Sequence, residues 1–361
     1  MPKNIVICCD GTGNEFGPTN SNVVKLFQML RRAPDEQAAF YDPGVGTMAA
    51  PEAISKFMKK ITWIFGLAFG FGLKRNVCEA YAYLVEYYRP DDRVFLFGFS
   101  RGAYTARTLA AMLHKCGLLE RGADNQIPYA FRMFRQKTNF AVAAGFKKTF
   151  ARPCSVHFVG VCDTVSTVGW VYNPVTFPFT ARNPSIAVFR HAISIDERRT
   201  HFRTNLFRAE AEQDCKQVWF AGVHADIGGS YPEPESGLAK LTLQWMLREA
   251  QAHGLLVDQK RSEEILLGTG KEGEAKPDPG AMQHDELQRL GWRIVEHLPR
   301  RYIDMRAEPP GATWTWSPIF GFYRPRFIAE KSCLHESVFR RKSVKPDYQP
   351  PNLPQGFTLE S

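Results

Sequence analysis

The sequence predicts an α/β fold, a mostly parallel sheet with helices on both faces. Short apolar runs that indicate buried strands alternate with longer amphipathic stretches that indicate helices, and this alternation is typical of parallel sheets. Each apolar run ends in polar residues or glycines, as expected at the carboxyl edge of such a sheet, where ligands bind. The apolar runs are residues 5–9, 93–97, 156–161 and 218–223, and the helical stretches are 22–32, 74–88 and 103–116.

The length of 361 residues, 44% of them hydrophobic, fits one large domain with a buried core. We expect a single catalytic domain over residues 1–345. Within it, Gly, Pro and charged residues interrupt the pattern and predict an irregular insert at about 256–325. The Pro-rich residues 346–361 are expected to form an extended C-terminal tail.

The formal net charge of +9 is spread along the chain and accompanies no nucleic-acid-binding motif. This pattern predicts a basic, solvated surface and no nucleic-acid partner. The same charge suits peripheral contact with an anionic membrane surface. The sequence does not indicate an oligomeric state.

The beginning of the chain lacks the apolar core of a signal peptide. Residues 61–73 form an apolar stretch of 13 residues with three glycines, which is too short to span a bilayer. The eight cysteines include no C-x-x-C pair, which favours free thiols in a reducing compartment. We therefore expect a cytoplasmic protein, with export by a specialised secretion system left open. The 61–73 stretch is either an apolar lip for an acyl chain or an ordinary buried segment.

Residues 98–102 form a G-x-S-x-G motif between an apolar run and a helical stretch. This is the setting of a nucleophile elbow, in which a strained turn exposes the serine hydroxyl. Gly98 and Gly102 are needed there because the strand and the helix pass close to each other. The backbone N–H of Arg101, at the start of the helix, is expected to stabilise an oxyanion. The motif predicts an α/β-hydrolase-like domain with Ser100 as nucleophile, and a serine that only caps the helix is the alternative.

A nucleophilic serine needs a histidine base and an acid that orients the base. In the α/β-hydrolase fold these three residues follow in the order Ser, Asp or Glu, His. Asp163 ends the run 156–161, and His224 ends the run 218–223. Because the carboxyl ends of parallel strands meet at one edge, Ser100, Asp163 and His224 form a triad in the required order.

The loop that follows the first apolar run, residues 10–14, is rich in exposed N–H groups. We expect Gly11 or Thr12 to supply the second oxyanion donor, with Asp10 organising the loop through its N–H groups. Good turn chemistry alone would also explain this sequence. A haloacid-dehalogenase phosphatase would need its nucleophilic aspartate at position 8, where Cys8 stands.

Five motifs in a fixed order resemble the DUF2235 family, an α/β-hydrolase group that includes the catalytic domain of Tle1-like type VI secretion phospholipase effectors. The motifs are the elbow and residues 9–14, 41–47, 161–165 and 222–231. The resemblance covers roughly residues 1–345 and implies Ser100 as nucleophile, Asp163 as acid and His224 as base. It also implies hydrolysis of glycerophospholipid esters. Two differences stand against it: Cys162 replaces a common Trp, and the effectors carry a long membrane-anchoring region that is missing from this sequence.

Other assignments use the same polar residues. Asp226 as acid and His335 as base would keep the chain order of the triad. A metal-dependent hydrolase built from Asp10, Asp163, His224 and Asp226 would leave the elbow unexplained. A non-catalytic binding scaffold would leave the ordered triad unexplained. The prediction is therefore a serine hydrolase of carboxylic esters, phospholipids or other lipid esters among them, that works through an acyl-enzyme without cofactor or metal.

Overall fold

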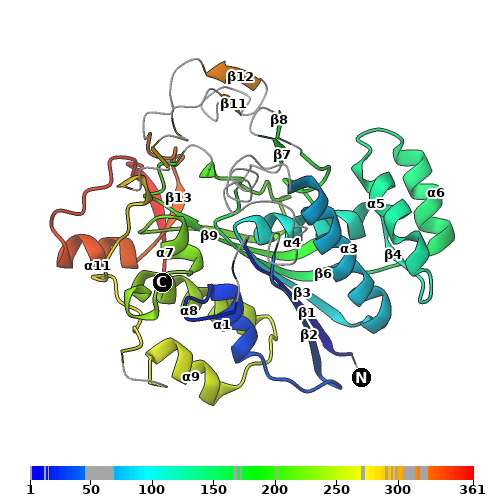
Figure 1. Ribbon diagram of the computed structural model, residues 1–361, viewed down its shortest axis with the longest axis horizontal. Coiled ribbons are helices and arrows are strands. Elements are labelled where there is room, and N and C mark those ends of the chain that lie inside the picture. The colour runs from blue at the N-terminus through cyan, green and yellow to red at the C-terminus, as the bar shows by residue number, and fades with distance from the viewer. Residues whose placement is uncertain are drawn as a thin grey trace, which may run out of the picture.

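At the centre of the structure lies an eight-stranded sheet in which all neighbouring strands are parallel (Figure 1). The strand order is β14-β13-β10-β9-β6-β3-β1-β2, which confirms the predicted α/β class. The strands are β1 (Asn4–Cys9), β2 (Gln37–Asp42), β3 (Arg93–Phe99), β6 (Val156–Cys162), β9 (Ile186–Ser194), β10 (Asp214–Phe220), β13 (Ser332–His335) and β14 (Phe357–Glu360).

The computed structural model describes most of the chain. The described residues are 2–44, 69–199, 202–288 and 324–361, together with 292, 293, 296, 300–303 and 314–317. Within the first three ranges, residues 12, 13, 15, 166–168, 171, 172, 175 and 270–272 are not described. Short elements outside the main sheet are β4 (Leu118–Leu119) with β5 (Ala151–Arg152), β7 (Gly169–Trp170) with β8 (Asn173–Pro174), β11 (Arg300–Ile303) with β12 (Trp314–Ser317), and the 3-10 turns η1 (Asp124–Gln126), η3 (Glu233–Glu235) and η4 (Glu286–Gln288).

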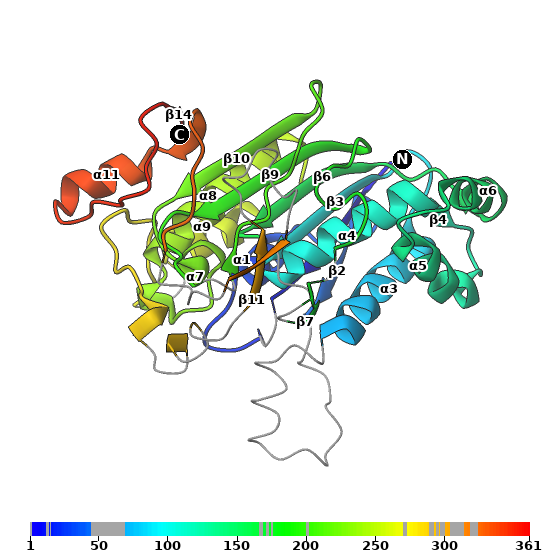
Figure 2. The same cartoon turned by 90° about the horizontal axis from the view of Figure 1, so that it is seen from above.

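Helices cover both faces of the sheet (Figures 1 and 2). One layer holds α3 (Phe69–Tyr87), α4 (Arg101–Cys116), α5 (Ile127–Arg135) and α6 (Phe140–Phe150). The other layer holds α1 (Asn22–Met29), α8 (Gly237–Ala252) and α9 (Gln259–Leu267). The short helix α7 (His224–Gly228) follows β10, and α11 (Ser337–Val344) follows β13 at the far edge. Of the described helices, none is long and apolar enough to cross a membrane.

Strand β1 shows why its residues form an uninterrupted apolar run. Ile5, Ile7 and Cys9 pack into the core under α3 and α4, whereas Val6 and Cys8 pack into the core on the α1 and α8 side. A strand covered on both faces needs apolar side chains at every position, since successive residues point to opposite faces. The same arrangement keeps the two adjacent cysteines apart, and both are free thiols.

The strand order reverses its direction between β1 and β3, because β2 lies on one side of β1 and β3 on the other. In open α/β sheets, ligands bind in the crevice outside the carboxyl ends of the strands at such a switch point. Asp10 follows β1 and Ser100 follows β3 at this place. The topology therefore places the predicted nucleophile at the position that the fold favours for a site.

Several elements differ from the sequence-based prediction. Strand β9 was not expected, and it lies between β6 and β10. His224 does not end a strand but begins α7, four residues after β10. The C-terminal tail ends in β14, which pairs with β13, and the expected insert contains the helix α9. In the 61–73 stretch, residues 61–68 lie outside the described residues, and Leu73 is buried in α3.

Candidate active site

The turn between β3 and α4 has the strained geometry of a nucleophile elbow. Ser100 has φ +57° and ψ −115°, a conformation that a residue with a side chain rarely adopts. Gly98 and Gly102 permit the close packing around it. A Cβ atom on Gly102 would lie 2.1 Å from the carbonyl oxygen of Cys9, and one on Gly98 would lie 2.5 Å from that of Gly102. Any larger residue at either position collides with backbone, so the two glycines are a steric requirement of the turn.

The side chain of Ser100 does not cap the helix that follows it. The alternative interpretation, a serine that serves only as helix cap, therefore fails. The backbone N–H of Ser100 donates to the carbonyl of Cys162, at the end of β6, with an N–O distance of 3.0 Å. This bond fixes the turn against the strand that leads to Asp163.

Asp163 and His224, which lie 61 residues apart in the chain, meet at this edge. The Nδ1 atom of His224 lies 2.5 Å from Oδ2 of Asp163, and both residues are buried. Asp163 directly follows β6 and has φ +42°, which aspartate tolerates better than most residues. The backbone N–H of Val223 donates to Asp226, which fixes the start of α7 and hence the position of His224.

The carboxylate of Asp163 is also held by Arg326, a residue that the sequence did not single out. Two guanidinium nitrogens of Arg326 lie 2.5 Å and 2.9 Å from the two carboxylate oxygens, and Arg326 is only 3% exposed. Arg326 also donates to Ser194 Oγ at 2.7 Å and to the carbonyl of Phe202. Burial alone would raise the pKa of Asp163, but Arg326 and His224 outweigh burial and hold that pKa well below its usual value. Asp163 is therefore a carboxylate at any pH of interest.

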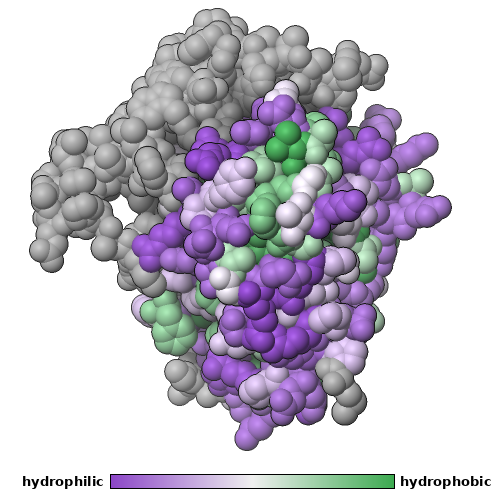
Figure 3. Space-filling view, turned by 90° about the vertical axis from the view of Figure 1, so that its right-hand side faces the viewer, coloured by the Kyte–Doolittle hydropathy of each residue, from purple (hydrophilic) through white to green (hydrophobic). Residues whose placement is uncertain are grey.

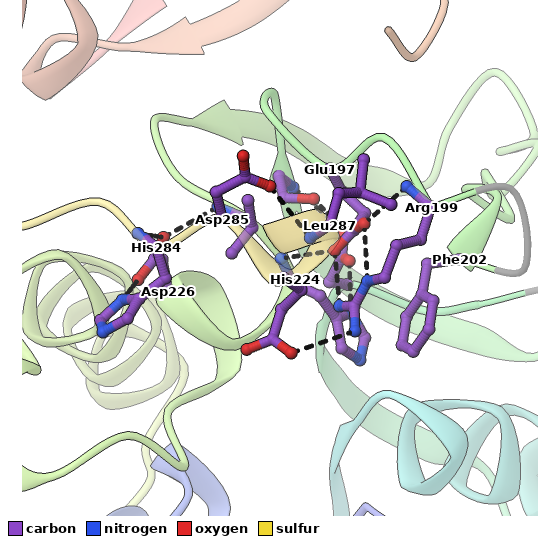
Figure 4. Close-up of polar contacts among 12 residues, drawn as sticks. Glu197, Arg199, Phe202, His224, Asp226, His284, Asp285 and Leu287 are labelled. Atoms are coloured by element: carbon purple, nitrogen blue, oxygen red, sulfur yellow. Dashed lines mark hydrogen bonds and ion pairs between the residues drawn. The ribbon is translucent and has the colours of Figure 1, made fainter. Parts of the chain in front are cut away.

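The ring of His224 contacts two aromatic rings. The centroid of Phe99 is 4.7 Å from the centroid of His224. The centroid of Phe202 lies at the same distance (Figure 4). Burial lowers the pKa of His224, although the hydrogen bond to Asp163 acts in the opposite direction. The imidazole is therefore neutral near pH 7. Because Asp163 is ionised, Nδ1 must carry the proton, which leaves Nε2 as the basic nitrogen.

Phe99 connects the elbow to α7. Its ring contacts His224 on one side and occupies the space above Gly228, where a Cβ atom would lie 1.9 Å from the ring. Gly228 therefore lets α7 approach the residue that precedes Ser100. The structure thus brings Asp163 and His224 into direct contact. Ser100 is placed next to this pair in the chain: it follows Phe99, whose ring contacts His224, and its N–H bonds the carbonyl of the residue that precedes Asp163.

The loop after β1 is organised by Asp10, as expected. One oxygen of Asp10 accepts from the N–H of Gly11 at 2.6 Å and from Asn14, and the other accepts from Ser21 and Tyr41. A Cβ atom on Gly11 would lie 3.5 Å from Cβ of Ser100, so this loop borders the nucleophile. The Gly11 N–H is already engaged by Asp10, which speaks against Gly11 as oxyanion donor. Thr12, the other candidate, lies outside the described residues.

The rival acid and base are not in contact, because each has another partner. Asp226 binds Nδ1 of His284 at 2.7 Å (Figure 4). Nε2 of His284 binds Glu235 at 3.0 Å. His335 binds Ser337 through Nδ1 at 2.8 Å, and its ring stacks on Phe220. In the described part of the chain, no group of three or more potential metal ligands is found.

A second charged group, also missed from the sequence, supports the backbone of His224. Glu197 forms a two-bond ion pair with Arg199 and accepts from the N–H of His224 at 3.2 Å. The guanidinium of Arg199 lies 3.8 Å from the centroid of Phe202 (Figure 4). These residues follow β9, so a prediction of that strand would have placed them at the same edge. Arg326 had no such signal, since it lies 163 residues beyond its partner.

The family model of the type VI secretion system Tle1-like phospholipase effector catalytic domain matches residues 3–249, more than half of the chain. This chain belongs to that family. The predicted resemblance to Tle1-like effectors is thereby confirmed. The matched residues include Ser100, Asp163 and His224 and end before Arg326.

Two further proteins are similar to this chain. An uncharacterized protein of Saccharomyces cerevisiae, YEL023C, is 35% identical over 224 residues, which cover 57% of this chain and 33% of the relative. The crystal structure of an uncharacterized protein from Pseudomonas aeruginosa superimposes with a TM-score of 0.46 at 18% identity, over 76% of this chain and 49% of that chain. This chain thus spans about a third of the length of the yeast relative.

Proposed function

We propose that this protein is a serine hydrolase that cleaves carboxylic esters of lipids, with phospholipids as the substrate class. The observation that carries the proposal is the buried contact between Asp163 and His224 beside the strained turn that holds Ser100. The order Ser, Asp, His along the chain fits the α/β-hydrolase arrangement. Membership in a family of phospholipase effectors supports lipids as substrates.

In this proposal each residue has one task. His224 Nε2 takes the proton of Ser100 Oγ as that oxygen attacks the ester carbonyl. Asp163 holds the histidine in the tautomer with the proton on Nδ1 and stabilises the imidazolium that forms. The backbone N–H of Arg101, at the N-terminus of a helix of 16 residues, donates to the oxyanion. Thr12 is the candidate for a second donor.

The reaction then proceeds in two halves. The tetrahedral intermediate collapses, the bond to the alcohol oxygen breaks, and the alcohol leaves with the proton from His224. Ser100 now carries the acyl group. His224 next removes a proton from water as the water attacks the acyl carbonyl, and returns that proton to Ser100 Oγ when the fatty acid is released.

Arg326 acts as a positioning residue through Asp163. Its guanidinium orients both carboxylate oxygens, so that Oδ2 faces His224. Arg326 also compensates the negative charge of Asp163, so the aspartate does not draw a permanent proton onto His224. A metal ion would have to compete with this guanidinium for Asp163, which favours a serine mechanism over the metal-dependent alternative. The engaged triad positions likewise favour an enzyme over an inert scaffold.

The test is hydrolysis of short- and long-chain nitrophenyl esters and of phospholipid vesicles by the protein and its Ser100→Ala variant. We expect turnover that rises with acyl length and that the variant lacks. Turnover that persists in Ser100→Ala, or the absence of Ser100-dependent turnover on every substrate, would refute the proposal. Insensitivity to chelators separates a serine mechanism from a metal mechanism.

A further inference from the structure

The segment that forms α5 and α6 is strongly basic. From residue 125 to residue 162 there is no aspartate or glutamate, whereas there are six lysines and arginines. Two of these six are engaged with backbone: Lys147 donates to the carbonyl of His114, and Arg152 donates to those of Tyr88 and Val85. The other four have exposed side chains: Arg132, Arg135, Lys137 and Lys148. Lys74, at the start of α3, adds a fifth exposed cation.

Helix α6 exposes apolar residues where a helix of a soluble domain normally has polar ones. Its first seven residues, Phe-Ala-Val-Ala-Ala-Gly-Phe, contain no polar side chain. Ala143 and Phe146 pack into the core, but Phe140 is 52% exposed and Val142 58% exposed. Tyr129 of α5 and Phe150 at the end of α6 are also exposed. Figure 3 faces this side of the molecule and shows a hydrophobic patch bordered by hydrophilic residues.

Next to these residues, α5 and the start of α3 form an open hollow of about 380 Å³. Three of the five exposed cations line it, together with Tyr129, whose ring lies 5.1 Å from the guanidinium of Arg132. The hollow is lined by Lys74, Asn125, Pro128, Tyr129, Phe131, Arg132 and Arg135. Asp124, just before Asn125, is the acidic residue nearest to it in the chain. Three cations and the side-chain amide of Asn125 around an open hollow suit a phosphate or carboxylate group.

We propose that this α5–α6 surface docks on an anionic lipid bilayer. The surface consists of the exposed residues Lys74, Tyr129, Arg132, Arg135, Lys137, Phe140, Val142, Lys148 and Phe150. Helix α6 inserts its apolar side between the lipid head groups, the cations face the negative membrane surface, and the hollow receives a head-group phosphate. The proposed function supplies the reason for this protein to approach a membrane, and the proposal rests on it in that respect alone. Docking itself needs no catalysis.

A bilayer explains the surface better than a second copy of the chain does. A twofold dimer would place this surface against itself and bring its cations together without acidic partners, which is unfavourable. A bilayer that contains anionic lipids supplies both the apolar phase for Phe140 and Val142 and the negative charge for the lysines and arginines. Each cation near such a surface contributes about 1 kcal/mol, or about a fivefold change in partitioning.

The test measures binding of the Ser100→Ala protein to vesicles, so that lipids are not consumed. The vesicles contain phosphatidylcholine alone or an equimolar mixture with phosphatidylserine. We expect binding to the anionic vesicles that falls about fivefold in each of Arg132→Gln and Lys148→Gln, and at least as much in Val142→Asp. Val142→Leu is expected to bind like the parent. The controls, Val344→Asp and Lys345→Gln, change an exposed apolar residue and an exposed lysine at the far edge of the sheet, and they should leave binding unchanged.

Equal binding by the α5–α6 variants and the parent would overturn the proposal, as would loss of binding in the two controls instead. A concentration-dependent dimer that Val142→Asp dissolves, measured by sedimentation velocity without lipid, would overturn it too. With Ser100 intact, Arg132→Gln, Lys148→Gln and Val142→Asp should hydrolyse vesicle phospholipid more slowly than the parent and keep its rate on a soluble nitrophenyl ester. Vesicle binding without any Ser100-dependent hydrolysis would refute the proposed function and leave the docking surface intact.

Discussion

Helix α7 contributes one residue to each of two aspartate–histidine pairs, and the two pairs differ in the third charged group. In the first pair, His224 binds Asp163, and Arg326 binds that aspartate. In the second pair, Asp226 binds His284, and Glu235 binds that histidine. The cation thus lies behind the acid in one pair, and an additional anion lies beside the histidine in the other.

This difference shifts the pKa values of the two histidines in opposite directions. In the first pair burial lowers the pKa of His224, and Arg326 holds Asp163 ionised. In the second pair burial also disfavours the cation, but Asp226 and Glu235 together raise the pKa of His284. Both nitrogens of His284 are engaged, so it has no lone pair to accept a substrate proton. An aspartate–histidine contact is thus not sufficient to indicate a base. Whether the histidine can act as a base depends on the third charged group that contacts the pair.

The largest expected effect separates the two histidines by activity. His224→Asn should lower kcat/KM for ester hydrolysis by about 10⁴-fold, because the serine loses its base. His284→Asn should stay within about tenfold of the parent, since it contacts no reacting group. Steady-state kinetics on a soluble nitrophenyl ester measures both. A comparable loss in both variants would show that the pairs are not functionally distinct.

The next effect concerns the cation behind Asp163. Arg326→Met leaves a buried carboxylate without its main partner and should cost about 3–5 kcal/mol of unfolding free energy. The acid limb of the pH–activity profile should move to higher pH, since an uncompensated Asp163 attracts the proton on His224 more strongly. Arg326→Lys keeps the charge and should restore most of the acid limb. Urea unfolding and kcat/KM against pH report the two quantities, and an unmoved acid limb in Arg326→Met would contradict the positioning role.

A smaller effect is expected for the second pair, in stability. Because the folded-state pKa of His284 is raised above 6.5, its protonated form stabilises the fold below pH 6.5, and this contribution disappears as the pH rises through the folded-state pKa. His284→Asn should therefore cost about 1 kcal/mol at acidic pH and less at alkaline pH. Urea unfolding of both proteins across this pH range tests the sign. A cost that grows with pH would mean that His284 is neutral in the folded protein.

The smallest effect concerns the acid limb of the pH–activity profile of the parent protein. Since the pKa of His224 is lowered, kcat/KM should fall with a midpoint below pH 6.5. Glu235→Gln, which changes the charge only beside His284, should leave that midpoint where it is. A shift in this variant would show that the two pairs titrate together through α7.

The sequence was sufficient for those parts of the site that depend on local pattern. The elbow at Ser100 was predictable because its glycines and flanking apolar run reflect a steric requirement within five residues. Asp163 was predictable because it follows a strand that is apolar apart from His157. Strand β9 was missed since Arg190 and His191 interrupt its apolar pattern, and both are buried, Arg190 through its ion pairs with Asp214 and Glu249.

The remaining parts depend on tertiary contacts that no local pattern encodes. Arg326 lies in a segment without helix or strand shortly before β13, and it contacts Asp163 at the end of β6, which β9 and β10 separate from β13 in the sheet. The pKa shifts of His224 and His284 likewise follow from partners that come from other elements. Spacing along the chain predicted which residues reach the carboxyl edge, but not which charged groups accompany them.

The most direct test of the central claim is to identify the residue that a fluorophosphonate probe modifies. The probe is applied to the protein, to His224→Asn and to His284→Asn, and the modified peptide is mapped by mass spectrometry. We predict modification of Ser100 in the protein and in His284→Asn, and none in His224→Asn, because only the pair with Asp163 activates the serine. Modification of another residue, or equal modification of Ser100 in His224→Asn, would contradict the account.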